Sequence, residues 1–151
     1  MARVFTRLVL AIGLTGLLLS SSVGLVSAAS VTLSTTLTGD EEVPGPGDPN
    51  GKGFVSLTIF DNGTICYFGK VQAIGRAITG AHIHIGAAGT AGPVVVDLDP
   101  FSADITGNKA EHCVQTTAEI ASAIMASPSN YYVNVHTEQF PDGAIRGQLG
   151  D

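Results

Sequence analysis

The sequence predicts an all-β domain, an antiparallel Greek-key β-sandwich or barrel with one short helix near residues 117–126. Short runs in which apolar and polar residues alternate recur along the chain, a pattern typical of half-buried strands. The chain also contains 19 glycines and 7 prolines, which punctuate these runs. Such punctuation favours antiparallel strands joined by turns over a helical or parallel α/β fold.

The first 28 residues are expected to be a signal peptide and not part of the fold. Arg3 and Arg7 make a positive start, Leu8–Leu19 is apolar, and Val26-Ser27-Ala28 resembles the end of a cleavable signal. The remaining residues, 29–151, have the length of one domain and contain no second long apolar run. We therefore expect a secreted or periplasmic protein with no membrane insertion after signal cleavage.

The charge of the chain argues against two classes of partner. The formal net charge is −6, and removal of Arg3 and Arg7 with the signal would bring it to about −8. The basic residues left are scattered: Lys52, Lys70, Arg76, Lys109 and Arg146. An acidic surface without a basic patch excludes nucleic acid and anionic membranes as expected partners. A protein or polysaccharide partner stays open.

The two cysteines, Cys66 and Cys113, are predicted to form one disulfide. An even number of cysteines in an exported chain favours pairing. The bond would close a loop of about 47 residues and stabilise the fold by about 3–4 kcal/mol in the chain-entropy description. Two separate buried thiols are the alternative.

The first half of the chain predicts three strands. Residues 31–37 alternate, residues 54–60 alternate again, and Asp61-Asn62-Gly63 is a strong hairpin turn leading into residues 64–71. Between the first two runs, residues 39–52 contain three prolines and four glycines. That composition cannot form a regular element, so a loop is expected there.

The second half predicts four more strands and the helix. Residues 81–85 and 93–98 flank a turn-rich segment, and residues 131–137 and 144–149 form a last hairpin. The helix is expected to begin after Thr116 or Thr117 as N-cap and to end at Ser127-Pro128. Its apolar stripe consists of Ile120, Ile124 and Met125.

Three of the four histidines lie in two of these predicted strands. His82 and His84 alternate with Ala81 and Ile83, so both imidazoles leave the same face of a strand, opposite the apolar residues. In the later strand His136 shares the corresponding outer face with Asn134. Neutral imidazole suits copper, zinc or nickel. Three histidines with one open position suit copper or a catalytic zinc.

The same residues also allow a structural interpretation. The histidines would then hydrogen-bond to the glycine-rich loops and hold them over the sheet. Arg146 is expected on the outer face as well, opposite Asn134 in the last hairpin. It would guide an anion toward the histidines or simply pair with Glu138 or Asp142. The sequence contains no catalytic triad motif and no phosphate-binding loop.

Five motifs occur in a characteristic order. They are Leu37-Thr38-Gly39-Asp40-Glu41-Glu42-Val43-Pro44, Ala81-His82-Ile83-His84, Gly92-Pro93-Val94-Val95, Tyr132-Val133-Asn134-Val135-His136-Thr137 and Ile145-Arg146-Gly147-Gln148. This series resembles the CHRD domain, which is named from chordin and is widespread in secreted bacterial proteins. The resemblance covers residues 31–149. It implies a binding or structural role, since in chordin the domain occurs as repeats within an extracellular antagonist of growth factors.

Two positions depart from the family pattern. The family usually has a glutamate before Ile-Arg-Gly, where this chain has Ala144, and Ile85 intervenes before Gly86. In the expected hairpin register the missing carboxylate would stand opposite His136. There it would have oriented a ligand histidine.

A weaker resemblance connects the chain with copper-zinc superoxide dismutases, which are Greek-key β-sandwiches with copper on an outer face. It implies copper-ligand roles for His82, His84 and His136 and an anion-guiding role for Arg146. No bridging histidine or zinc-binding loop is found, so a full dismutase is not expected. Three alternatives remain: an exported module that binds copper, a purely structural or protein-interaction domain of the cell envelope or extracellular matrix, and a copper-dependent dismutase-like enzyme.

Overall fold

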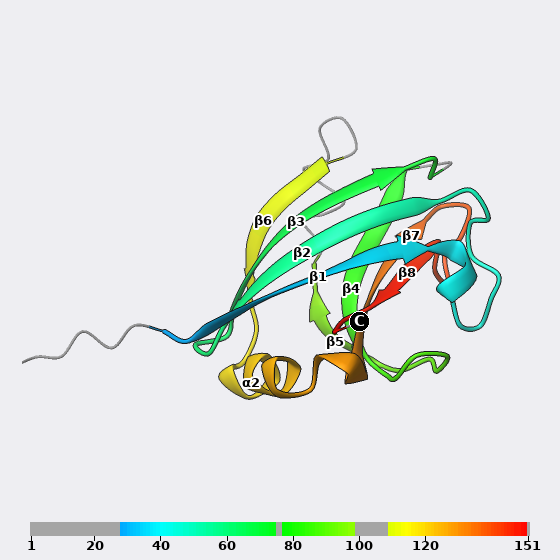
Figure 1. The fold of residues 1–151 in the computed structure, drawn as a ribbon. Coiled ribbons are helices and arrows are strands. Elements are labelled where there is room, and N and C mark those ends of the chain that lie inside the picture. Colours follow the sequence, from blue (N-terminus) through cyan, green and yellow to red (C-terminus); the bar gives the residue numbers. More distant parts are fainter. Residues whose placement is uncertain (1–27, 75–76, 99–108, 151) are drawn as a thin grey trace, which may run out of the picture.

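The computed structural model describes residues 28–74, 77–98 and 109–150, so the expected signal peptide lies outside the described residues apart from Ala28. The described residues contain eight strands in one antiparallel sheet, and the sheet curls into a near-closed barrel (Figure 1). A single α-helix of these residues lies across one end of the barrel. The predicted all-β fold class with one short helix is confirmed.

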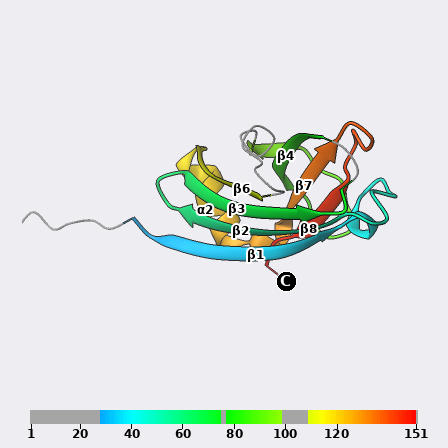
Figure 2. The same cartoon turned by 90° about the horizontal axis from the view of Figure 1, so that it is seen from above.

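The strands in chain order are β1 (Ser30–Thr38), β2 (Lys52–Phe60), β3 (Thr64–Gln72), β4 (Ile78–Ile85), β5 (Val94–Asp97), β6 (Lys109–Gln115), β7 (Tyr131–Thr137) and β8 (Ile145–Gln148). The helical elements are the 3-10 turns η1 (Gly39–Glu41) and η2 (Pro128–Asn130) and the helix α2 (Ala118–Ala126). The order across the sheet is β5-β4-β7-β8-β1-β2-β3-β6. Seen from above, β4 and β7 run obliquely to β1, β2 and β3, as expected for a strongly twisted sheet (Figure 2).

Alternate residues of the strands fill the interior of the barrel. In β2, Val55, Leu57 and Ile59 are buried, and their neighbours point outward. In β4 the buried apolar side chains are those of Ala81 and Ile83, both 0% exposed. The period of two that the sequence displays therefore separates an apolar inner face from a more polar outer face.

Helix α2 completes this core. Ala121 and Ile124 belong to the same apolar cluster as the strand residues. Thr117 is the N-cap, and its hydroxyl oxygen accepts a hydrogen bond from the Ile120 backbone N–H at 3.3 Å. The helix ends at Ala126, directly before the Ser127-Pro128 pair.

Strand β6 is an element that the sequence pattern does not reveal. Only Ala110 of its seven residues is buried, because β6 pairs with β3 and carries charged side chains at the edge of the sheet. Its pairing places Cys113 directly opposite Cys66. The two sulfurs are bonded, as the cysteine count predicts. The bond links partly buried Cys66 to exposed Cys113 on the outward side.

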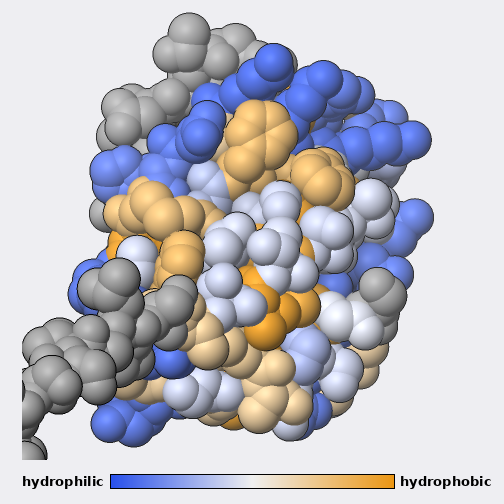
Figure 3. All heavy atoms as spheres, turned by 60° about the vertical axis from the view of Figure 1, so that its left-hand side comes forward, coloured by the Kyte–Doolittle hydropathy of each residue, from blue (hydrophilic) through white to orange (hydrophobic). Residues whose placement is uncertain are grey.

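The surface mixes apolar and polar residues. On the face drawn in Figure 3, orange apolar residues and pale residues of intermediate hydropathy occupy the centre, and blue hydrophilic residues gather along the upper and right-hand edges. The large hydrophobic residues that are exposed are Phe54, Phe68, Ile85 and Val94. Within the described ranges, no helix has the length and apolar character needed to span a membrane.

Removing the disulfide should lower the free energy of unfolding by about 2–4 kcal/mol, because the cross-link restricts the unfolded chain. Urea unfolding of the oxidised protein and of the double variant Cys66→Ala/Cys113→Ala measures this difference. Dithiothreitol should bring the wild type to the stability of the variant and leave the variant unchanged. Equal stability of the oxidised and reduced wild type would contradict the prediction.

Candidate metal centre

Antiparallel pairing of β4 with β7 brings His82, His84 and His136 together on the outer face. His82 pairs with Asn134 and Gly80 pairs with His136. Because Gly80 has no side chain, the His82 ring lies over it, with Cε1 3.3 Å from where a Cβ would stand. The centroids of the His82 and His136 rings are 4.9 Å apart. One ligand atom from each histidine lies within 4.8 Å of the others, so this cluster can hold a metal ion.

Two backbone carbonyls orient two of these imidazoles. His84 Nδ1 is 2.8 Å from the Gly92 carbonyl oxygen, and His136 Nδ1 is 2.9 Å from the Pro141 carbonyl oxygen. A carbonyl only accepts, so each Nδ1 carries the proton and each Nε2 presents its lone pair. Both Nε2 atoms are buried and have no hydrogen-bond partner. The hydrogen bond at Nδ1 fixes this tautomer and leaves Nε2 free to bind a metal ion.

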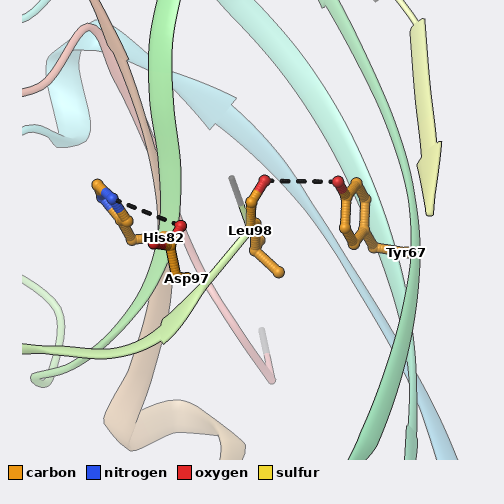
Figure 4. A network of polar contacts seen from close by, with 4 residues as sticks. All are labelled: Tyr67, His82, Asp97 and Leu98. Atoms are coloured by element: carbon orange, nitrogen blue, oxygen red, sulfur yellow. Dashed lines mark hydrogen bonds and ion pairs between the residues drawn. The ribbon is translucent and has the colours of Figure 1, made fainter. Parts of the chain in front are cut away.

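His82 offers the other ring nitrogen. Its Nε2 lies 4.0 Å from the Asp97 Oδ1 atom, whereas its Nδ1 is buried and unpartnered. Figure 4 shows His82 and Asp97 directed toward one another, away from Leu98, whose carbonyl accepts the Tyr67 hydroxyl at 3.4 Å. Nδ1 is therefore the His82 ring nitrogen that is both buried and without a hydrogen-bond partner.

Burial favours the neutral form of two of the imidazoles. Desolvation lowers the pKa of His84 and of His136 below the ordinary value of 6.5, and the neighbouring His82 adds to this effect. The hydrogen bonds to the two carbonyls act in the opposite direction. A neutral imidazole near neutral pH is the form that binds a metal ion without first releasing a proton.

Tyr132 supports the ring of His84. The two rings are stacked, with centroids 4.8 Å apart and an interplanar angle of 11°. The Tyr132 hydroxyl lies 3.2 Å from the Gly92 N–H and 3.4 Å from the Gly92 carbonyl, the same residue that holds His84. The guanidinium carbon of Arg146 lies 3.4 Å from the centroid of the Tyr132 ring.

Arg146 is on the outer face opposite Asn134, in the predicted register. It is 1% exposed. Its guanidinium donates to the carbonyl oxygens of Thr90 and Ala87 at 2.8 and 3.1 Å and to Gln148 Oε1 at 3.3 Å. These bonds, which the sequence does not indicate, hold residues 86–93 over the sheet. The role of guiding an anion stays a prediction.

Glu42 is a buried residue of this face that sequence reasoning does not find. It follows η1, is 5% exposed, and accepts two hydrogen bonds from Asn134 Nδ2, at 2.9 and 2.8 Å. Burial raises its pKa from 4.5 to about 7, although the charge of Arg146 and the bond from Asn134 act to lower it. A carboxylate within a loop rich in glycine and proline gives no periodic signal of burial.

Gly143 makes room for this contact. A Cβ there would overlap the Glu42 carboxylate and lie 2.8 Å from Asn134 Nδ2, and the φ of Gly143 is +141°.

The next residue, Ala144, occupies the position where the family resemblance expects a glutamate. Its carbonyl accepts a hydrogen bond from the Asp48 N–H at 2.7 Å. Because Ala144 has no carboxylate, it cannot orient His136 in the way that the family pattern implies. The carbonyl of Pro141 accepts the hydrogen bond from His136 instead.

The model of the CHRD domain family matches residues 33–149, which extend from within β1 to just beyond β8. The chain therefore belongs to the CHRD domain family. No curated protein and no solved structure matches the chain. The family assignment agrees with the five ordered motifs of the sequence.

Glu42→Gln should change how stability depends on pH. Because the pKa of Glu42 is about 7 in the folded protein and 4.5 as its ordinary value, its contribution to stability is full below pH 4.5 and is lost as the pH rises through 7. Glutamine does not ionise. As the pH rises from 4.5 to above 7, the free energy of unfolding of Glu42→Gln should increase relative to that of the wild type by about 2–3 kcal/mol.

Urea unfolding in the presence of a chelator at several pH values measures this shift. The histidines contribute equally to both proteins, so the comparison isolates Glu42. Glu41→Gln, a change of the exposed neighbouring residue, serves as the control and should show no shift. Parallel stability curves for Glu42→Gln and wild type would disprove the prediction.

Proposed function

We propose that this protein is an exported CHRD-domain module that binds one copper ion through His82 Nδ1, His84 Nε2 and His136 Nε2. The observation that carries the proposal is that His82, His84 and His136 each bring one ligand nitrogen within 4.8 Å of the others. Each of these histidines also has a buried ring nitrogen without a hydrogen-bond partner. Metal–nitrogen bonds of about 2.0–2.1 Å place two ligand atoms of one ion at most about 4 Å apart. The three ligand nitrogens must therefore move closer to one another when an ion binds.

The donor set favours copper over other metals. All three donors are neutral imidazoles, and a divalent site of nitrogen donors binds copper more tightly than zinc, nickel or cobalt. Magnesium and calcium prefer oxygen ligands, of which this trio has none. Zinc is therefore the competing ion to be measured beside copper.

Two observations support an extracytoplasmic location. The Cys66–Cys113 disulfide is typical of proteins that fold in an oxidising compartment. Residues 1–28 also have the sequence pattern that predicts a signal peptide. Copper capture outside the cytoplasm is consistent with both.

A purely structural role is the second candidate, and the two carbonyl contacts favour it. His84 and His136 each bind a loop through Nδ1, so they hold residues 86–93 and 138–144 in place whether or not an ion is bound. His82 has no such bond. Substitution of His84 should therefore affect both loop attachment and metal binding, whereas substitution of His82 should affect metal binding alone.

In metal-free protein, His84→Ala should lower the free energy of unfolding by about 1–3 kcal/mol. The substitution removes the hydrogen bond to the Gly92 carbonyl and exposes the Tyr132 ring that stacks on His84. His82→Ala should lower the free energy of unfolding by less than about 1 kcal/mol. Thermal and urea unfolding with a chelator present measure both values. Equal losses in the two variants would contradict this division of roles.

Copper titration of the exported, oxidised protein tests the proposed function directly. We expect one copper per chain at micromolar affinity or tighter, lost in His82→Ala and in His136→Ala. The control is His112→Ala, which changes an exposed histidine of β6 and should bind like the wild type. Affinity should also fall as the pH is lowered through about 6, since ligand imidazoles must be neutral.

Absence of binding, or binding that neither variant changes, would leave the structural or interaction role. So would an affinity that is equal at pH 5 and pH 7.5. If copper binds, superoxide turnover is the next assay for the dismutase-like alternative. Activity that survives both His136→Ala and Arg146→Ala would separate any such turnover from this site.

A further inference from the structure

A fourth unpartnered atom accompanies the three imidazole nitrogens. In the part of the chain that the structure describes, four buried side-chain nitrogen or oxygen atoms have no hydrogen-bond partner: His82 Nδ1, His84 Nε2, His136 Nε2 and Asn134 Oδ1. Asn134 is 4% exposed, so bulk water does not satisfy this oxygen. A buried acceptor without a donor costs about 1–3 kcal/mol.

The register places Asn134 at the border of the histidine cluster. It lies directly opposite His82 across the β4–β7 pair, and it precedes His136 by two residues on the same face. Side chains directly opposite one another in an antiparallel pair have Cβ atoms about 4.5–5.5 Å apart. The unpartnered oxygen therefore belongs to the same small region as the three unpartnered nitrogens.

Glu42 determines which end of the Asn134 amide is free. Both carboxylate oxygens accept from Nδ2, which turns Oδ1 away from Glu42. Arg146 lies beside Asn134, but its guanidinium donates to Thr90, Ala87 and Gln148. Asn134 Oδ1 is thus an acceptor without a donor, and its neighbours are the imidazole nitrogens whose lone pairs can bind a metal ion.

We infer that Asn134 Oδ1 accepts a hydrogen bond from a water molecule bound to the metal ion, and that Glu42 is the positioning residue that holds the amide in this orientation. The inference rests on the metal site proposed above. Three imidazole ligands leave one position open on the ion. A bound water is a hydrogen-bond donor, so it matches an atom that only accepts. The open position is thereby suited to an exchangeable, proton-bearing oxygen ligand.

The packing around Glu42 supports a positioning role. Gly143 and Gly47 both approach it so closely that a Cβ on either would collide with its side chain. Such close packing restricts the carboxylate, and the carboxylate in turn restricts the amide. Direct ligation by Asn134 Oδ1 is the competing geometry, although an amide oxygen is a harder ligand than copper prefers.

The test uses the intact protein loaded with copper(II). Pulsed electron-nuclear double resonance in H₂O and D₂O detects exchangeable protons on a copper-bound water. Wild type should show them, and Asn134→Ala and Glu42→Ala should change their coupling while copper affinity falls by about 10–100-fold, less than in His82→Ala. Glu42→Gln keeps an oxygen acceptor for Nδ2 and should retain the wild-type spectrum. Glu41→Ala is the matched control and should leave the spectrum unchanged.

The outcomes separate the two proposals. If wild type binds no copper, both the proposed function and this inference fail. If copper binds but no exchangeable proton is detected, or Asn134→Ala weakens binding as strongly as His82→Ala, only this inference fails. It also fails if Asn134→Ala and Glu42→Ala keep the wild-type spectrum. Because Glu42→Ala and Glu42→Gln do not alter Asn134 itself, the test holds even where Asn134→Ala does not fold.

Discussion

The pairing of β4 with β7 is the constraint on which the rest of the site depends. Its register sets His82 opposite Asn134 and Gly80 opposite His136. A shift of one residue would turn every side chain of the strand to the other face, moving histidines into the core and Ile83 into the polar layer. The buried apolar residues of both strands therefore hold the imidazoles in place, since their burial penalises any other register.

The outer face of β4, β7 and β8 is a second, polar layer and not a free surface. Loop residues 86–93 are held by Arg146, and residues 138–144 are held by His136. The carbonyls that these loops contribute do two things at once. They satisfy the Nδ1 protons of His84 and His136, and they leave each Nε2 bare. Loop attachment and preparation of a metal site are thus consequences of the same hydrogen bonds.

Much of this arrangement follows from local pattern. Alternation predicts the strands and the face on which His82, His84 and His136 lie, and the cysteine count predicts the disulfide. The pattern does not reveal β6, whose edge position leaves it with one buried residue in seven. It also does not reveal Glu42, because the burial of a loop carboxylate depends on Asn134 and Gly143, residues far away in the chain.

The sequence by itself determined the all-β fold class, the inward and outward sides of each long strand, and the residue types available for a metal ion. These properties follow from a period of two residues and from side-chain chemistry, which are both local. Only the tertiary structure decided which ring nitrogen of His84 and of His136 is free, and which end of the Asn134 amide has no hydrogen-bond partner. Those choices depend on hydrogen bonds to the carbonyls of Gly92 and Pro141 and to the carboxylate of Glu42, which reach the site through loops whose course no local pattern encodes.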